Sequence, residues 1–260
     1  MLLSISNIAW AAENDAEMYA FLRDKKFCGL EIAPTRIFPD TPYIHINEAK
    51  MFSAELKEKY GLSISSMQSI WYGRGENIFG SKDERRKLIE YTKQAIDFAA
   101  AIGCGNLVFG CPKNRNRPDD IKNYEGIAYD FFSQIAEYSA KNATIIALEP
   151  NPPMYGTNFI NTTEDAIYFC RQLNHEGLKV NIDVGTMIAN GEPVSLVADN
   201  LDIVNHIHIS EPKLAPIEKR ELHREISALK FNKYVSIEMG NCGDLVKVKK
   251  AAEYVAGSLI

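Results

Sequence analysis

The chain has 260 residues, of which 46% are hydrophobic and 24% charged, a balance typical of a globular protein with a sizeable core. Its formal net charge is -5 and no long basic stripe is present, so we expect no nucleic-acid partner. No stretch approaches the roughly 20 apolar residues of a membrane-spanning helix, so we expect no membrane partner either.

The N-terminal ten residues lack a basic region, and Ser4, Ser6 and Asn7 interrupt their apolar run, so they predict a strand rather than a signal peptide. The five cysteines are an odd number without paired spacing, which fits a reducing compartment. We therefore expect a cytoplasmic protein. The sequence leaves open whether it forms a homo-oligomer.

Short apolar or β-branched runs alternate with longer segments of helical period, the pattern of parallel strands joined by crossover helices. Together with the length and the lack of any linker, this predicts one (β/α)₈ TIM barrel domain over residues 1–260. An open doubly wound sheet would commonly show a Gly-rich turn after its first strand, where this chain has Trp10 to Glu13. The expected strands are Leu3–Ala9, Gly29–Ala33, Ser63–Gln68, Asn106–Phe109, Thr144–Leu148, Lys179–Asp183, His206–Ile209 and Val235–Glu238.

The segments between these strands predict helices and loops at the rim of the barrel. Pro34–Pro42 follows a strand directly and predicts a loop, as does Pro150–Pro153 further along. The clearest helix spans Lys82–Ile102, where apolar residues recur every three or four positions until Gly103 ends it. Another helix should begin after residues 161–164, where Asn or Thr can cap it and Glu164 suits its positive end.

The last four expected strands end in side chains that can bind a metal. Glu149, Asp183, His208 and Glu238 each close an apolar run, in the segments IALE, NID, HIH and SIE. In a parallel barrel such strand ends meet at one mouth, where barrel enzymes place their chemistry. Three buried carboxylates this close would repel one another unless they were protonated or shared a cation. We therefore expect these four residues to hold one divalent metal ion.

The donor set is rich in oxygen, which favours Mn²⁺, Mg²⁺ or Co²⁺, with Zn²⁺ also open. Side chains alternate across a strand, so Asn181, His206 and Ser236 should point into the barrel beneath the ligands. They either orient the ligands by hydrogen bonds or serve as satisfied polar groups of the core.

At these residues the sequence resembles the xylose isomerase-like barrel superfamily of sugar isomerases and epimerases, and within it the ketose 3-epimerase branch. The segments that carry the resemblance are ALEPN, NIDVGT, HIHISEP and YVSIEM, supported by GLEIAPTR and AAAIGCGNLVFG. The resemblance implies that Glu149, Asp183, His208 and Glu238 bind one metal ion and that the two glutamates also move the substrate proton. It further implies a carbohydrate or polyol substrate.

The chain departs from this family pattern in two places. A His often found three residues beyond the Asp ligand is Thr186 here, and an Arg found in some epimerases is Leu214. Substrate contacts inferred from those residues do not carry over. The acid three residues after the His ligand is retained as Glu211 and is expected to contact substrate.

The leading hypothesis is a metal-dependent sugar isomerase or epimerase acting on a ketose-like sugar or sugar phosphate. Glu149 and Glu238 would be the catalytic acid and base, working through a metal-bound enediolate. Further substrate contacts are expected at the rim, and the basic run 113–117 could bind a phosphate or carboxylate. These contacts are Trp10, Glu31, Trp71, Lys113, Arg115 and His223.

Other functions stay open. A metal-dependent polyol dehydratase or lyase could use the same residues, and a non-catalytic sugar-binding barrel is the alternative from another class. A phosphodiesterase like the apurinic endonucleases of the superfamily fits less well, since that branch uses additional His ligands and this chain has five His in all.

Overall fold

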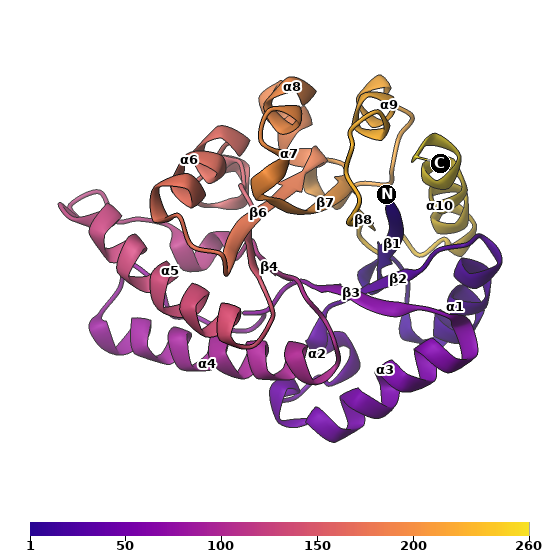
Figure 1. The fold of residues 1–260 in the computed structure, drawn as a ribbon, viewed down its shortest axis with the longest axis horizontal. Helices are drawn as coiled ribbons and strands as arrows, with labels where there is room; N and C mark the ends of the chain where they lie inside the picture. Colours follow the sequence, from indigo (N-terminus) through magenta and orange to yellow (C-terminus); the bar gives the residue numbers. More distant parts are fainter. Residues whose placement is uncertain (260) are drawn as a thin grey trace.

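Eight parallel strands close into a barrel in chain order in the computed structural model, which describes residues 1–259 (Figure 1). The closure is made by β1 and β8, which pair over Leu2–Ile5 and Tyr234–Ile237. The predicted TIM barrel is confirmed. The strands are β1 Leu2–Ser6, β2 Gly29–Ile32, β3 Ser63–Met67, β4 Leu107–Phe109, β5 Ile146–Leu148, β6 Leu178–Asp183, β7 Val204–Ser210 and β8 Tyr234–Glu238.

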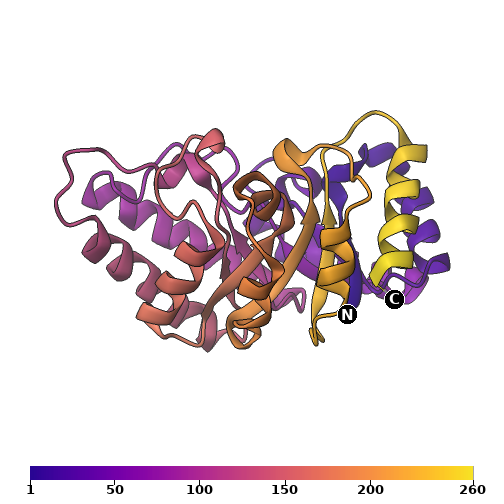
Figure 2. The same cartoon turned by 90° about the horizontal axis from the view of Figure 1, so that it is seen from above.

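Helices surround the barrel on its outside, and the two ends of the chain lie on neighbouring elements (Figures 1 and 2). None of the helices within residues 1–259 combines the length and the apolar character that crossing a membrane would require. The helices are α1 Asp15–Asp24, α2 Pro34–Ile37, α3 Ile46–Tyr60, α4 Lys82–Ala101, α5 Tyr124–Lys141, α6 Thr163–Leu173, α7 Val184–Asn190, α8 Val194–Ala198, α9 Glu221–Ser227 and α10 Leu245–Leu259.

The ends of α4 and α6 follow from capping chemistry. Ser81 accepts the backbone N–H of Glu84, and the Glu84 carboxylate returns to the N–H of Ser81, so α4 begins where the sequence predicts. Helix α6 begins with the same arrangement at Thr162, where the acid that returns is Asp165, because the third helical residue is the one that reaches back to the cap. Glu164 lies in the first turn of α6, as the sequence predicts.

Some boundaries differ from the sequence prediction. Strand β1 stops at Ser6, because the side chain of Asn7 then accepts the N–H of Ala33 in place of a backbone partner. The expected loop Pro34–Pro42 contains the short helix α2, since a proline suits the first turn of a helix. All five cysteines are free.

Candidate metal centre

The carboxyl ends of β5 to β8 bring four side chains together at the mouth of the barrel. One ligand atom from each of Glu149, Asp183, His208 and Glu238 lies within 4.8 Å of the others, and all four residues are buried. Sheet register explains the meeting, because Asp183 pairs with His208 across β6 and β7, and Glu238 pairs with Ser210 across β7 and β8. Glu149 directly follows β5.

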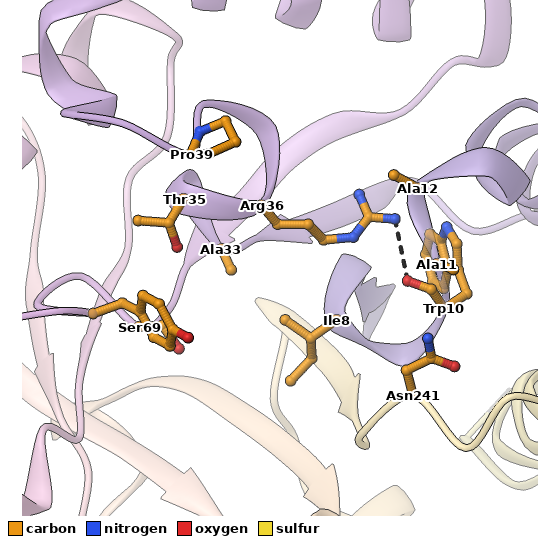
Figure 3. Close-up of a pocket in the computed structure, with 11 residues that line it drawn as sticks. Ile8, Trp10, Ala11, Ala12, Ala33, Thr35, Arg36, Pro39, Ser69 and Asn241 are labelled. Carbon is orange, nitrogen blue, oxygen red and sulfur yellow. Dashed lines mark hydrogen bonds between the residues drawn. The ribbon is translucent and has the colours of Figure 1, made fainter.

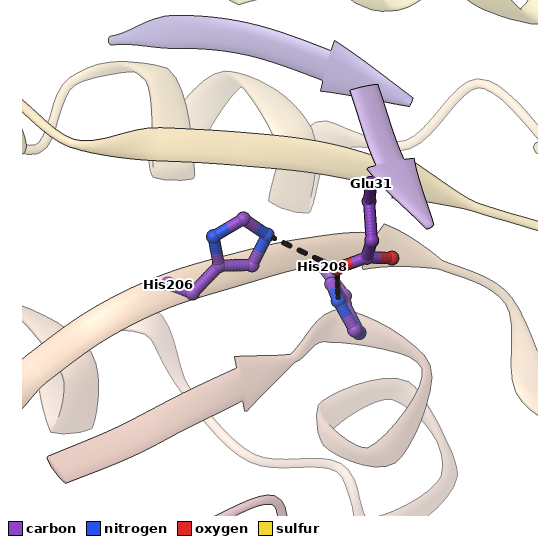
Figure 4. A group of neighbouring side chains, drawn as sticks. All are labelled: Glu31, His206 and His208. Atoms are coloured by element: carbon purple, nitrogen blue, oxygen red, sulfur yellow. Dashed lines mark hydrogen bonds and ion pairs between the residues drawn. The ribbon is translucent and has the colours of Figure 1, made fainter. Parts of the chain in front are cut away.

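His208 lies at the centre of this group. Its Nδ1 atom is 3.0 Å from Glu149 Oε1 and 3.2 Å from Glu238 Oε2. Its Nε2 atom is 2.8 Å from Glu31 Oε2 on the other side of the ring (Figure 4). A proton on Nε2 that is held by Glu31 leaves Nδ1 free to act as a ligand, the arrangement commonly found behind a metal-binding histidine.

Glu31 was expected at the rim as a substrate contact, and the structure places it elsewhere. It is completely buried in β2 and points into the barrel, where its carboxylate lies 2.8 Å from His208 Nε2 and 3.5 Å from His206 Nε2. The sequence carries a signal for this position, since Glu31 stands between the apolar residues Leu30 and Ile32 of one strand. A charged residue that alternates with apolar ones faces inward in a barrel whose outer surface is covered by helices.

The carboxylate of Glu149 is held in place by two amides. Asn181 donates to its Oε1 at 2.8 Å, and Asn151 donates to its Oε2 at 3.2 Å. The expected orienting role is thus present for Asn181, whereas His206 and Ser236 bond to each other at 2.8 Å as polar groups of the core. Asn151 was missed, because it lies in a loop where no periodicity indicates direction.

The carboxylate of Asp183 is likewise fixed by its surroundings. Its Oδ2 accepts the backbone N–H of Thr186 at 2.9 Å and the Thr186 hydroxyl at 2.8 Å. Its Oδ1 accepts the hydroxyl of Ser210, which in turn accepts the N–H of Gly185. Thr186, which replaces a histidine of the family pattern, therefore orients Asp183 here. Ser210 was missed, although it alternates with His206 and His208 along β7 and therefore shares their face.

Burial and mutual repulsion set the protonation of the group. Burial raises the pKa of Glu238, and burial together with the charge of Glu149 raises the pKa of Asp183. Burial alone would lower the pKa of His208, but the nearby charges of Glu31 and Glu238 outweigh it and hold that pKa well above its usual value. Protons thus relieve the crowding of carboxylates, and a divalent cation would relieve it in their place. The donor set fits such an ion.

Three of the four residues open onto a cavity of about 190 Å³, here called the metal-centre cavity. Gly110 lies beside this cavity. A Cβ atom at position 110 would come within 2.7 Å of Glu149 Oε2, so a larger residue there would press on the carboxylate. Tyr155 lines one side of the metal-centre cavity, and its hydroxyl accepts the N–H of Lys213 at 2.6 Å. This hydrogen bond joins the loop after β5 to the loop after β7. The lining residues are Gln68, Ser69, Val108, Gly110, Cys111, Pro112, Glu149, Asn151, Tyr155, Asp183, Leu214 and Glu238.

The two tryptophans expected as substrate contacts are buried, and they do not line the metal-centre cavity. The ring N–H of Trp10 donates to Asp15 at 2.8 Å, and that of Trp71 donates to Thr92 at 2.9 Å. Both polar atoms are therefore engaged by the protein itself. A direct hydrogen bond from either indole to the substrate is not supported by this arrangement.

The basic run after β4 does not form a single anion site. Arg115 is fully buried and donates to the backbone oxygen of Glu149 at 2.8 Å and to Asn151 Oδ1 at 2.7 Å. Arg117 instead lies over the ring of Tyr124, and Lys113 is exposed. Arg115 thus supports the loop that carries Glu149, a role that its expected position at the rim did not indicate.

Glu211 and His223 are also engaged away from the metal-centre cavity. Arg220 donates to both carboxylate oxygens of Glu211, at 2.7 and 2.5 Å. His223 Nδ1 lies 3.1 Å from the hydroxyl of Tyr254 in α10. The structure therefore places both residues in contacts that hold the loop after β7 and the start of α9.

His206 makes a testable contribution to stability. Burial lowers its pKa to about 3, whereas an unfolded histidine titrates near 6.5. Below pH 6.5 the unfolded chain binds a proton that the folded chain does not, so the free energy of unfolding falls as the pH falls from 6.5 toward 3. Between pH 7 and 5 this contribution is about 2 kcal/mol.

Urea unfolding at both pH values, with a chelator present, measures the effect. The variant His206→Asn should lose about 2 kcal/mol less than the wild type on acidification. His175→Asn is the control, because His175 lies in the loop after α6, where its side chain contacts the N–H of Gly177 and not the barrel interior. This variant should lose as much stability on acidification as the wild type. An equal loss in wild type and His206→Asn would show that His206 is not held neutral.

Several solved structures resemble this fold over nearly the whole chain. The 3-keto-D-glucoside 4-epimerase YcjR from E. coli has a TM-score of 0.77 at 18% identity, covering 99% of both chains. The D-psicose 3-epimerase from Clostridium cellulolyticum H10, solved with D-tagatose, has a TM-score of 0.79 at 16% identity, covering 100% of this chain and 99% of that one. The IolI protein, solved with a zinc atom, has a TM-score of 0.70 at 13% identity, covering 100% and 95%.

At these identities the structural likeness shows a shared fold. No curated protein sequence matches the chain significantly. The family model described as "xylose isomerase-like TIM barrel" matches residues 19–255, nearly the whole length of the barrel. The chain therefore belongs to the xylose isomerase-like TIM barrel family.

Proposed function

We propose that the protein is a divalent-metal-dependent isomerase or epimerase of a ketose-like sugar, with Glu149 and Glu238 as its proton carriers. One observation carries this proposal: two buried glutamates from β5 and β8 approach the same His208 nitrogen, at 3.0 and 3.2 Å, and both line one cavity. Two carboxylates that reach one space from different strands can remove a proton and return one from different sides.

Glu149, Asp183, His208 and Glu238 would hold the metal ion. When bound, a divalent ion supplies Lewis-acid stabilisation of the negative charge that develops on a carbonyl or hydroxyl oxygen. The oxygen-rich ligand set favours Mn²⁺, Mg²⁺ or Co²⁺, with Zn²⁺ as a further candidate. One structural neighbour, the IolI protein, was solved with a zinc atom, which supports a divalent ion at this end of the barrel.

The remaining residues of the centre position the proton carriers. Asn181 and Asn151 fix both oxygens of Glu149, so its carboxylate keeps one orientation toward the cavity. Tyr155 and Leu214 line the cavity and would limit the access of water to the carbon that exchanges its proton. Thr186 and Ser210 fix both oxygens of Asp183, which supports its role as a ligand.

Proton exchange in D₂O tests this function directly. The metal-loaded protein is incubated with a panel of ketoses, and deuterium at the carbon beside the carbonyl is detected by NMR or mass spectrometry. We expect uptake with at least one sugar and none after the metal has been removed with a chelator. Loss of water from a polyol would point to a dehydratase instead, and saturable binding without any exchange would point to a non-catalytic sugar-binding barrel.

A further inference from the structure

A second and larger cavity opens at the same mouth of the barrel, on the side of β1 and β2 (Figure 3). It measures about 510 Å³ and is called the side cavity. Its walls come from the segments that follow β1, β2, β3 and β8, and Asn241 stands three residues beyond Glu238. The lining residues are Ile8, Trp10, Ala11, Ala12, Ala33, Thr35, Arg36, Pro39, Ser69, Tyr72 and Asn241.

The side cavity adjoins the metal-centre cavity at Ser69, which lines both. Ser69 has a φ of +54°, a left-handed conformation that a non-glycine residue adopts at a cost. Its hydroxyl donates to Gln68 Oε1 at 2.6 Å, and Gln68 Nε2 donates to Ser6 at 3.0 Å, so the junction is anchored to β1. At about 190 Å³ the metal-centre cavity lies below the roughly 300–1,000 Å³ of typical ligand pockets, and the two cavities together fall within that range.

The side cavity presents polar groups but no free charge. Arg36 is the one charged residue among its described lining residues, and Asp15 pairs with it through contacts of 2.6 and 3.2 Å. The guanidinium also donates to the backbone oxygen of Trp10 at 3.2 Å. A phosphate here would find its counter-charge already taken, whereas Thr35 and Asn241 offer the neutral groups that bind hydroxyls.

Tyr72 provides an aromatic surface beside this space. Its side chain is 71% exposed, although its backbone is fixed by a turn in which its N–H donates to Ser69 O at 2.9 Å. Tyr72 also lines a third cavity of about 490 Å³, which shares Ser69, Cys111 and Pro112 with the metal-centre cavity. The ring of Tyr72 thus belongs to two hollows of the mouth. An aromatic ring with a polar tip at such a place suits a ligand with an apolar face and hydroxyl edges, which is the character of a sugar ring.

We propose that the substrate is a ketose unit linked to a second, uncharged sugar, and that this second sugar lies in the side cavity against Tyr72. This inference rests on the proposed function, because it takes the metal-centre cavity to hold the ketose. It names a glycoside or oligosaccharide as the substrate class. It also separates this class from sugar phosphates, whose charge would find no unpaired counter-charge among the described lining residues of the side cavity.

Calorimetric titration with three related probes tests the inference. The probes are D-fructose, D-fructose 6-phosphate and the disaccharide isomaltulose, which carries glucose on the C6 oxygen of fructose in place of the phosphate. The wild-type protein loaded with Mg²⁺ should bind isomaltulose about tenfold more tightly than fructose, or ~1.4 kcal/mol. Fructose 6-phosphate should bind no better than fructose. Tyr72→Ala should remove the preference for isomaltulose and leave fructose binding unchanged.

Tyr168→Ala is the matched control, because Tyr168 is 61% exposed on α6 and lines neither the side cavity nor the metal-centre cavity. It should leave all three affinities unchanged. Equal binding of isomaltulose and fructose, tighter binding of the phosphate, or an unchanged preference in Tyr72→Ala would each overturn the inference. Deuterium exchange is measured separately, so binding of isomaltulose without exchange rejects the proposed function alone.

Discussion

Replacement of Glu238 by glutamine should lower the rate of deuterium exchange about 10²–10⁴-fold, the usual contribution of a positioned acid or base. Glutamine keeps the size of the side chain but cannot carry a proton between substrate and water. Glu149→Gln should have an effect of the same order. The NH₂ group of the new amide would also face one of the two N–H donors that Asn181 and Asn151 direct at the carboxylate.

The measurement is single-sugar exchange in D₂O followed by NMR, with circular dichroism to show that the fold survives. Glu192→Gln serves as the control, because Glu192 accepts the backbone N–H of Thr163 at the start of α6 and does not line the metal-centre cavity. It should exchange at the wild-type rate. Wild-type exchange in either pure Glu149→Gln or Glu238→Gln would reject the pair as the proton carriers.

Replacement of Asp183 by asparagine should weaken binding of the divalent ion at least about 100-fold, beyond the 10–100-fold cost of losing an outer hydrogen bond. One of three anionic ligands is lost, while asparagine can still accept the N–H of Thr186 and cap α7. The wild type should gain about 2.7 kcal/mol in its free energy of unfolding when the ion is present at 100 times its Kd. Asp183→Asn should gain almost nothing at that concentration.

Titration calorimetry gives the affinity, and urea unfolding with and without Mn²⁺ gives the stabilisation. Asp202→Asn is the control, because Asp202 pairs with Arg171 on the surface at 2.7 Å. It should bind the ion as the wild type does. Unchanged affinity in Asp183→Asn would place the ion elsewhere or reject it altogether.

The sequence predicted the barrel because buried parallel strands and amphipathic helices leave different periods in the chain. It also indicated which residues would meet, because Asp183, His208 and Glu238 lie near the carboxyl ends of consecutive strands. The register of neighbouring strands in the closed barrel then places these strand ends side by side. The repeated pattern of strands and strand-end polar residues was therefore enough to predict the barrel and the residues that meet at its mouth.

The supporting contacts could not be predicted in the same way. Glu31 and His208 are 177 residues apart, and their contact depends on how β2 and β7 face each other across the closed barrel. Asn151 follows a strand in a segment whose side-chain directions have no period, and the same is true of Trp10 and Glu211. Thr186 lies in the short helix α7, whose start at the cap Asp183 the sequence did not indicate. For these residues the sequence indicated the end of the barrel but not the partner of each side chain.

Anomalous diffraction from crystals grown with Mn²⁺ tests the central claim most directly. The account predicts one strong peak per chain, surrounded by Glu149, Asp183, His208 and Glu238, with His208 still bonded to Glu31 through Nε2. No peak at this position under saturating Mn²⁺, or a peak held by other side chains, would contradict it.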